Sequence, residues 1–131
     1  MNQEFKKEWV AALRSGEFIQ GKNALCVDNK YCCLGVACEL LHRKGLTPKK
    51  VTENFRDITY YGTVETSSLL PEDVQQFMEL TERSPVVFVP ETKKSVDSMP
   101  SYFLSKHINL STLNDNDVSF KDIADLIESS L

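Results

Sequence analysis

The sequence predicts an α+β fold in a single compact domain that spans residues 1–131. Three observations support this prediction. Apolar residues recur at helical spacing near both ends of the chain, and short runs of β-branched and aromatic residues lie between them. The length leaves room for one hydrophobic core but not for two. We expect an N-terminal helix, a small β-hairpin, central helices with short antiparallel strands, and a C-terminal helix.

The first part of the chain is typical of a helix, a hairpin and a second helix. Helical spacing of apolar residues predicts a helix over residues 2–15, and Gly16 is placed to end it. Asp28-Asn29 supplies turn residues for a hairpin within residues 18–33. A further helix is predicted from Leu34 to the glycine at position 45. The side chains expected in the core are Trp9, Leu13, Leu34, Val36, Ile123 and Ile127.

The second part predicts shorter elements. Residues 58–61 and 85–90 are predicted strands, and the second is expected at a sheet edge because proline stands at both of its ends. Pro71 can begin a helix. That helix is expected to turn inward Val74, Phe77 and Met78. Residues 91–100 are polar and predict a loop, and Ser119 begins the last helix with a sequence like a capping box.

Composition places the protein among water-soluble globular domains. Hydrophobic residues make up 41% of the chain and charged residues 26%, and no apolar run approaches the roughly 20 residues of a membrane span. The first residues lack the apolar segment of a secretory signal. We therefore expect a cytoplasmic protein.

Charge is distributed unevenly along the chain. Residues 1–50 hold nine Lys or Arg against five Asp or Glu, giving +4, whereas residues 51–131 hold six against fourteen, giving −8. A net charge of −4 does not suit phosphate-backbone binding, so a nucleic-acid partner is not expected. A small anionic ligand should prefer the first part of the chain.

The four cysteines raise the question of a metal site. A reducing cytosol favours free thiols or metal ligands over disulfides. The residues close enough in sequence to bind zinc are Cys26, Cys32 or Cys33, Cys38 and His42. The usual pairs of ligands two to four residues apart are absent, and buried reduced cysteines are the commoner outcome. No metal and no cofactor are therefore expected.

A nucleophilic cysteine is a second possibility at the same place. Cys32 or Cys33 would lie at a helix N-terminus, where a thiol pKa is lowered, and His42 or His107 could act as the base. No third group that would orient the base is recognisable. We therefore assign no catalytic residue, and a small cysteine-dependent hydrolase or transferase remains an alternative.

The segment from Gly16 to Asn23 nearly matches a phosphate-binding loop. That loop works between a strand and a helix, whereas here a helix precedes it, and Asn23 stands where a hydroxyl residue is needed. What remains is the possibility that backbone N–H groups near Gly16 and Gly21, beside Arg14 and Lys22, contact a phosphate.

A calcium-loop pattern fails in a similar way. Asp115-Asn116-Asp117 resembles the start of such a loop. However, Phe120 occupies the position of the required glycine and Leu126 that of the required glutamate. A turn before the last helix is the better interpretation.

Four sequence blocks, which we call the signature blocks, resemble a family of small phage and prophage accessory proteins. The blocks are Trp9-x3-Leu13-Arg14-Ser15-Gly16-Glu17 with Gln20-Gly21-Lys22, then Tyr31-Cys32-Cys33-Leu34-Gly35-Val36-x-Cys38, then Leu113-Asn114-Asp115, and lastly Ser119-Phe120-x2-Ile123-Ala124-Asp125-Leu126-Ile127-Glu128. The resemblance spans both ends of the chain. It carries over no catalytic residue.

The resemblance implies an anti-defence role in the host cytoplasm. Such a protein would bind and sequester a nucleotide-derived signalling molecule without catalysis, often at a site in a homo-oligomer. The polar and aromatic residues of the blocks suit a purine-ribose-phosphate ligand. The candidate binding residues are Arg14, Gln20, Lys22, Tyr31, Asn114 and Asp115. An alternative is a protein-interaction inhibitor of a host defence or metabolic protein, acting through an exposed apolar or acidic face after residue 50.

Overall fold

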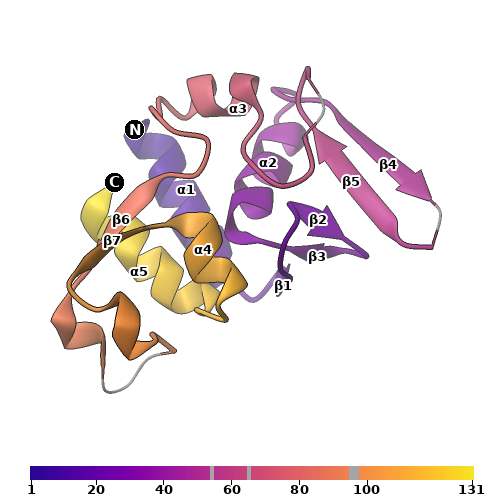
Figure 1. The fold of residues 1–131 in the computed structure, drawn as a ribbon. Coiled ribbons are helices and arrows are strands. Elements are labelled where there is room, and N and C mark those ends of the chain that lie inside the picture. Colours follow the sequence, from indigo (N-terminus) through magenta and orange to yellow (C-terminus); the bar gives the residue numbers. More distant parts are fainter. Residues whose placement is uncertain (54, 65, 95–97) are drawn as a thin grey trace.

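The structure is a computed structural model that describes residues 1–53, 55–64, 66–94 and 98–131, and it confirms the α+β fold (Figure 1). The helices are α1 (Gln3–Arg14), α2 (Cys33–Arg43), α3 (Glu72–Phe77), α4 (Leu110–Asp115) and α5 (Phe120–Ser130), with 3-10 turns at Glu91–Lys94 and Ser101–Phe103. The strands are β1 (Ile19–Gln20), β2 (Cys26–Val27), β3 (Lys30–Tyr31), β4 (Lys49–Glu53), β5 (Asp57–Tyr61), β6 (Val86–Val89) and β7 (Lys106–Asn109).

The helices α1 and α5 lie side by side, and α2 lies between them and a five-stranded sheet (Figure 1). The strand order in that sheet is β1-β3-β2-β5-β4, with β1 parallel to β3 and the other pairs antiparallel. A separate antiparallel pair, β6 and β7, packs beside α5. Among the helices of the described residues, none combines the length and the hydrophobicity needed to cross a bilayer.

Caps and apolar stripes place α1 and α5 as the sequence predicts. The Asn2 side chain caps α1 by accepting from the Phe5 N–H at 3.1 Å, and Ser119 caps α5 by accepting from the Asp122 N–H at 3.2 Å. Trp9 is fully buried, and its Nε1–H donates to the Cys33 carbonyl at 2.9 Å. This bond fixes α1 against the first turn of α2.

The predicted hairpin is present as β2 and β3. Asp28 and Asn29 form its turn with φ of 52° and 62°, in the left-handed region that aspartate and asparagine tolerate better than other non-glycine residues. The predicted strand at residues 85–90 is β6, which pairs only with β7 within the described residues.

Two expectations for the second part are revised. Phe77 is 38% exposed and is not buried with Val74 and Met78. Its ring packs edge to face with the ring of Phe5, with centroids 6.2 Å apart. The polar segment predicted as a loop begins with a 3-10 turn, and residues 95–97 lie outside the described residues.

Gly35 allows α2 to approach the backbone before β2. A Cβ at this position would stand 1.8 Å from the Leu25 carbonyl oxygen, which is backbone and cannot rotate away. The approach is used by the Cys32 N–H, which donates to the same oxygen at 3.2 Å. The glycine of the second signature block therefore has a packing role.

We expect Gly35→Ala to lower the free energy of unfolding by about 3 kcal/mol or more, because the added methyl group forces α2 away from Leu25. Gly45→Ala is the matched control, since its Cβ would meet open space and only its φ of +75° is unfavourable, at a cost of about 1 kcal/mol. Urea unfolding measures both variants. Equal losses would contradict the packing role of Gly35.

Candidate functional site

The signature blocks meet around the side chain of Asn114, at the end of α4. This amide is fully buried. Its Oδ1 accepts from the Cys33 N–H at 3.1 Å and from Gln20 Nε2 at 3.0 Å, and its Nδ2 donates to the Gly21 carbonyl at 2.8 Å. One side chain therefore connects β1 and its following turn, the N-terminus of α2, and α4.

The Gln20 side chain continues this network toward α5. Its Nε2 also donates to the Val118 carbonyl at 2.8 Å, and its Oε1 accepts from the Phe120 N–H at 3.1 Å. Both amide hydrogens are thus used, whereas the oxygen keeps the capacity for one more hydrogen bond. The amide of Gln20 has a fixed orientation at the N-terminus of α5.

A hollow of about 550 Å³ lies where the end of α1 faces the start of α5, and we call it the α1–α5 groove. Its lining residues are Leu13, Arg14, Gly16, Phe18, Gln20, Ser119, Phe120 and Lys121. Leu13, Phe18 and Phe120 are largely buried and give the groove an apolar surface. Arg14 and Lys121 add two positive charges.

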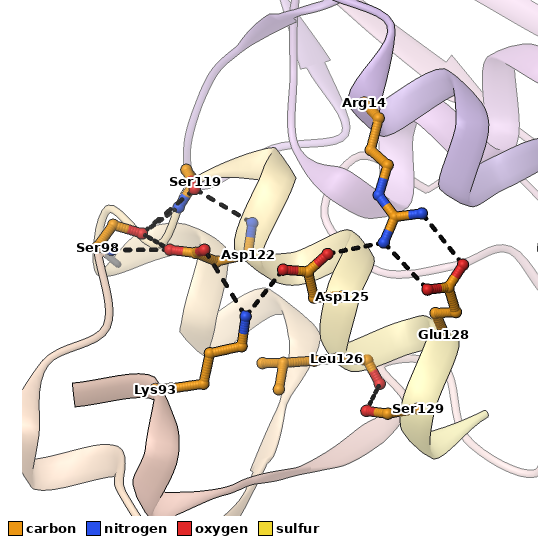
Figure 2. A network of polar contacts seen from close by, with 9 residues as sticks. All are labelled: Arg14, Lys93, Ser98, Ser119, Asp122, Asp125, Leu126, Glu128 and Ser129. Atoms are coloured by element: carbon orange, nitrogen blue, oxygen red, sulfur yellow. Dashed lines mark hydrogen bonds and ion pairs between the residues drawn. The ribbon is translucent and has the colours of Figure 1, made fainter. Parts of the chain in front are cut away.

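Arg14 is held by the acidic face of α5 (Figure 2). Its guanidinium donates to Asp125 at 2.7 Å and to Glu128 at 3.1 and 3.2 Å, and these bonds raise the pKa of Arg14. Asp125 also accepts from Lys93 Nζ at 2.8 Å. Lys121, by contrast, makes no ion pair within the described part of the chain, so its charge is available at the groove.

The segment after β6 is tied to the first turn of α5 through a buried carboxylate (Figure 2). Asp122 is 2% exposed and accepts from the Ser98 N–H at 2.7 Å and from Ser98 Oγ at 2.6 Å. Ser98 Oγ in turn accepts from the Ser119 N–H at 2.8 Å. These bonds fix the helix start that forms one wall of the groove.

A smaller hollow of about 250 Å³ shares Gln20 with the groove. It is lined by Gln20, Gly21, Lys22, Asn114 and Asp117. Lys22 Nζ is 2.6 Å from the Asp117 carboxylate, so its charge is already balanced. The nearby Asp115 Oδ1 accepts from the Asn23 N–H at 2.9 Å and holds the turn after β1.

Tyr31 lies behind the apolar surface of the groove. Its ring meets Phe18 edge to face, with centroids 5.0 Å apart, and the Arg43 guanidinium lies 5.1 Å from the Phe18 centroid. Burial raises the pKa of the Tyr31 hydroxyl. Tyr31 therefore supports Phe18 and is not one of the residues that line the groove.

The structure separates the six predicted binding residues. Arg14 lines the α1–α5 groove, and Gln20 lines both the groove and the smaller hollow. Lys22 and Asn114 line the smaller hollow, and Tyr31 and Asp115 line neither. Sequence reasoning missed Phe18, Phe120 and Lys121. The two phenylalanines have the pattern of core residues, and no signal distinguishes Lys121 from an ordinary exposed lysine.

In the segment from Gly16 to Asn23, which nearly matches a phosphate-binding loop, one of the two glycines has no free backbone N–H. Gly16 ends α1 with φ of 78°. The Gly21 N–H donates to the Tyr31 carbonyl at 2.7 Å, so it is not available to a phosphate, and Lys22 is paired. The expectation of a phosphate contact at Gly21 is therefore wrong.

The cysteine side chains are buried and free. Burial raises the pKa of the Cys32 thiol to about 11 and the pKa values of Cys33 and Cys38 well above their ordinary range. A buried thiol that stays protonated is a poor nucleophile. His42 Nδ1 lies 2.9 Å from the Thr47 carbonyl. Within the described residues, no three His, Cys, Asp or Glu side chains are grouped to hold a metal ion.

Comparison of the sequence with models of protein families assigns the chain to a family. The family model described as a domain of unknown function (DUF8296) matches residues 1–131. No curated protein and no solved structure matches the chain.

We expect Asn114→Ala to lower the free energy of unfolding by about 3 kcal/mol or more, because the Cys33 N–H and the Gly21 carbonyl each lose the hydrogen bond with this side chain and Gln20 Nε2 loses one of its two acceptors. Asn116→Ala is the matched control, since Asn116 is exposed and its side chain donates one hydrogen bond, to the Thr112 carbonyl. Urea unfolding compares the two variants. A loss for Asn114→Ala no larger than for Asn116→Ala would contradict the structural role of this amide.

The stability of the protein should depend on pH through Asp125, which accepts hydrogen bonds from Lys93 and Arg14. Partial burial alone would raise the pKa of Asp125, but hydrogen bonds from Lys93 and Arg14 outweigh it and lower that pKa. A carboxylate whose pKa is lowered by folding stabilises the folded state at pH values above about 4, the ordinary pKa of aspartate. This contribution is lost as the pH falls through the pKa of Asp125 in the folded protein.

The stability difference between wild type and Asp125→Asn should therefore shrink as the pH falls below about 4. Asp57→Asn is the control, because Asp57 is exposed and makes no ion pair among the described residues, and its difference should stay small throughout. Thermal unfolding across the pH range measures both. If the stability difference between wild type and Asp125→Asn does not change with pH, the pKa of Asp125 is not lowered by Lys93 and Arg14 and the prediction is wrong.

Proposed function

We propose that this chain, which belongs to the DUF8296 family, binds and sequesters a small nucleotide-derived molecule in the α1–α5 groove without transforming it. The observation that supports this most is the combination found there. Apolar and aromatic surface, a fixed amide and two cations line one open hollow of about 550 Å³. Drug-sized ligands occupy sites of about 300 to 1,000 Å³, so a nucleotide is of suitable size.

Each part of the groove suits a part of such a ligand. Leu13, Phe18 and Phe120 line the groove and are 4 to 8% exposed, and a base can pack against the small apolar surface that they leave open. The remaining lone pair of Gln20 Oε1 can accept from an exocyclic amine. The Lys121 ammonium has no ion pair among the described residues and can donate to a phosphate through charge-assisted hydrogen bonds, whereas the charge of Arg14 is shared with Asp125 and Glu128.

The lining favours binding over chemistry. None of the described lining residues is a cysteine, a histidine or a carboxylate, the groups that commonly act as nucleophile or base. The Ser119 hydroxyl is occupied as the cap of α5. The raised pKa values of the buried thiols also count against a cysteine-dependent reaction.

The biological part of the proposal comes from the resemblance of the signature blocks to phage accessory proteins. A phage protein that removes a signal such as a cyclic nucleotide or an ADP-ribose derivative from the host cytoplasm would suppress a defence response that depends on that signal. Sequestration needs only affinity and abundance, which suits a groove without catalytic groups.

Calorimetry with ligand-free protein and a panel of cyclic dinucleotides, cyclic ADP-ribose isomers and common nucleotides tests the proposal. We expect at least one compound to bind and Lys121→Glu to weaken that binding about tenfold or more, because a phosphate loses a charged donor and meets a carboxylate. A glutamate in the first turn of α5 is favourable to the helix, so the fold should be retained.

Lys106→Glu is the control for this measurement, because it makes the same charge change at an exposed position on β7, away from the groove. It should leave the affinity unchanged. If no compound of the panel binds, the proposal is overturned in favour of an inhibitor that acts on a host protein. Equal effects of the two variants would place the ligand elsewhere on the molecule.

A further inference from the structure

We infer that β4 is a self-complementary edge that pairs antiparallel with β4 of a second copy of the chain, extending the five-stranded sheet across a two-fold axis. β4 is the outer strand of the sheet, and within the described residues β5 is the only strand that it pairs with. Four of its five side chains are exposed. A strand edge of this kind carries unpaired backbone groups that can accept another strand. This inference is independent of the proposed ligand.

The charges along β4 favour one direction and one register for the pairing of two copies. The strand begins with Lys49 and Lys50 and ends with Glu53. Antiparallel pairing centred on Val51 places Lys49 opposite Glu53 of the second copy at both ends, so opposite charges face each other twice. Parallel pairing would instead align like charges. Lysines usually deter pairing at an edge, but here the opposing Glu53 supplies the compensating charge.

The face of β4 that carries Lys49, Val51 and Glu53 is exposed to solvent at the centre of the strand. Residues paired across the hairpin share a face, so Lys49, Val51 and Glu53 lie on the same side as the buried Tyr61. Lys49 reaches back to Glu39 at 3.0 Å but keeps a third of its side chain exposed. Val51 is 46% exposed, because the hairpin of β4 and β5 extends beyond α2 (Figure 1).

The same register brings together two exposed apolar side chains. Phe55, which follows β4, is 98% exposed, and Leu46, which precedes it, is 48% exposed. In an antiparallel pair centred on Val51, the end of one β4 lies beside the start of the other. Phe55 of each copy therefore lies at the same end of the strand pair as Leu46 of its neighbour, and a contact between these two apolar side chains would remove exposed surface from water.

A sheet edge of this length buries little area, so the dimer should be weak and concentration-dependent. Sedimentation of the full chain over a concentration series should show a monomer–dimer equilibrium. Glu53→Lys should shift it to monomer, because lysine then faces Lys49 of the second copy. Glu82→Lys makes the same charge change at an exposed position outside β4 and should leave the equilibrium unchanged.

The register has its own test in a cysteine crosslink. Residues directly opposite in antiparallel strands have Cα atoms about 4.5 to 5.5 Å apart, within the range that a disulfide spans. Val51→Cys should therefore crosslink to its own copy on mild oxidation, and the native thiols should not interfere because they are buried. Glu53→Cys is the control, since the two copies of residue 53 would stand about 13 Å apart along the strands.

The two experiments leave distinct outcomes. A concentration-dependent dimer that Glu53→Lys abolishes, together with a crosslink at position 51 and none at position 53, supports the inference. A monomer throughout the concentration series overturns it. A dimer that keeps its strength in Glu53→Lys, or that does not crosslink through position 51, overturns it as well and places the contact on another surface.

Discussion

The arrangement of this protein depends on one buried amide. Asn114 has no contact with water, and the backbone groups that it satisfies come from segments about eighty and ninety residues away in sequence. A buried polar group without a partner costs about 1 to 3 kcal/mol, so these segments cannot shift independently. The amide also orients Gln20, which in turn holds the N-terminus of α5 opposite α1. The shape of the α1–α5 groove therefore follows from a hydrogen-bond network in the core.

Elements that pack through a regular apolar stripe could be predicted from the sequence. The spacing of Phe5, Trp9 and Leu13 indicates α1, and that of Ile123 and Ile127 indicates α5. β4 gives no such signal, because Lys49–Glu53 is mostly polar and exposed on both faces, and its pairing is set by β5. α4 has six residues, too few for a 3.6-residue period to be recognised.

The candidate site could be predicted only in part, for a related reason. Polar residues in a distinctive sequence block can bind a ligand or satisfy the core, and sequence does not separate the two. Gln20 and Asn114 were predicted as ligand contacts, but their partners lie across the fold and most of their hydrogen-bonding capacity is used inside the protein. Arg14 remains at the groove, yet Asp125 and Glu128 share its charge. Lys121 is the cation of the groove that has no ion pair among the described residues, and only the structure places it there.

The central claim is that the α1–α5 groove is the ligand site of this protein. The most direct measurement is an amide NMR titration of the full chain with the compound of the nucleotide panel that binds most tightly. If the ligand binds there, shift changes should concentrate at the backbone amides of Gly16, Gln20 and Lys121, which line the groove. Changes concentrated on the sheet or around the β6 and β7 pair, with the groove amides unaffected, would contradict it.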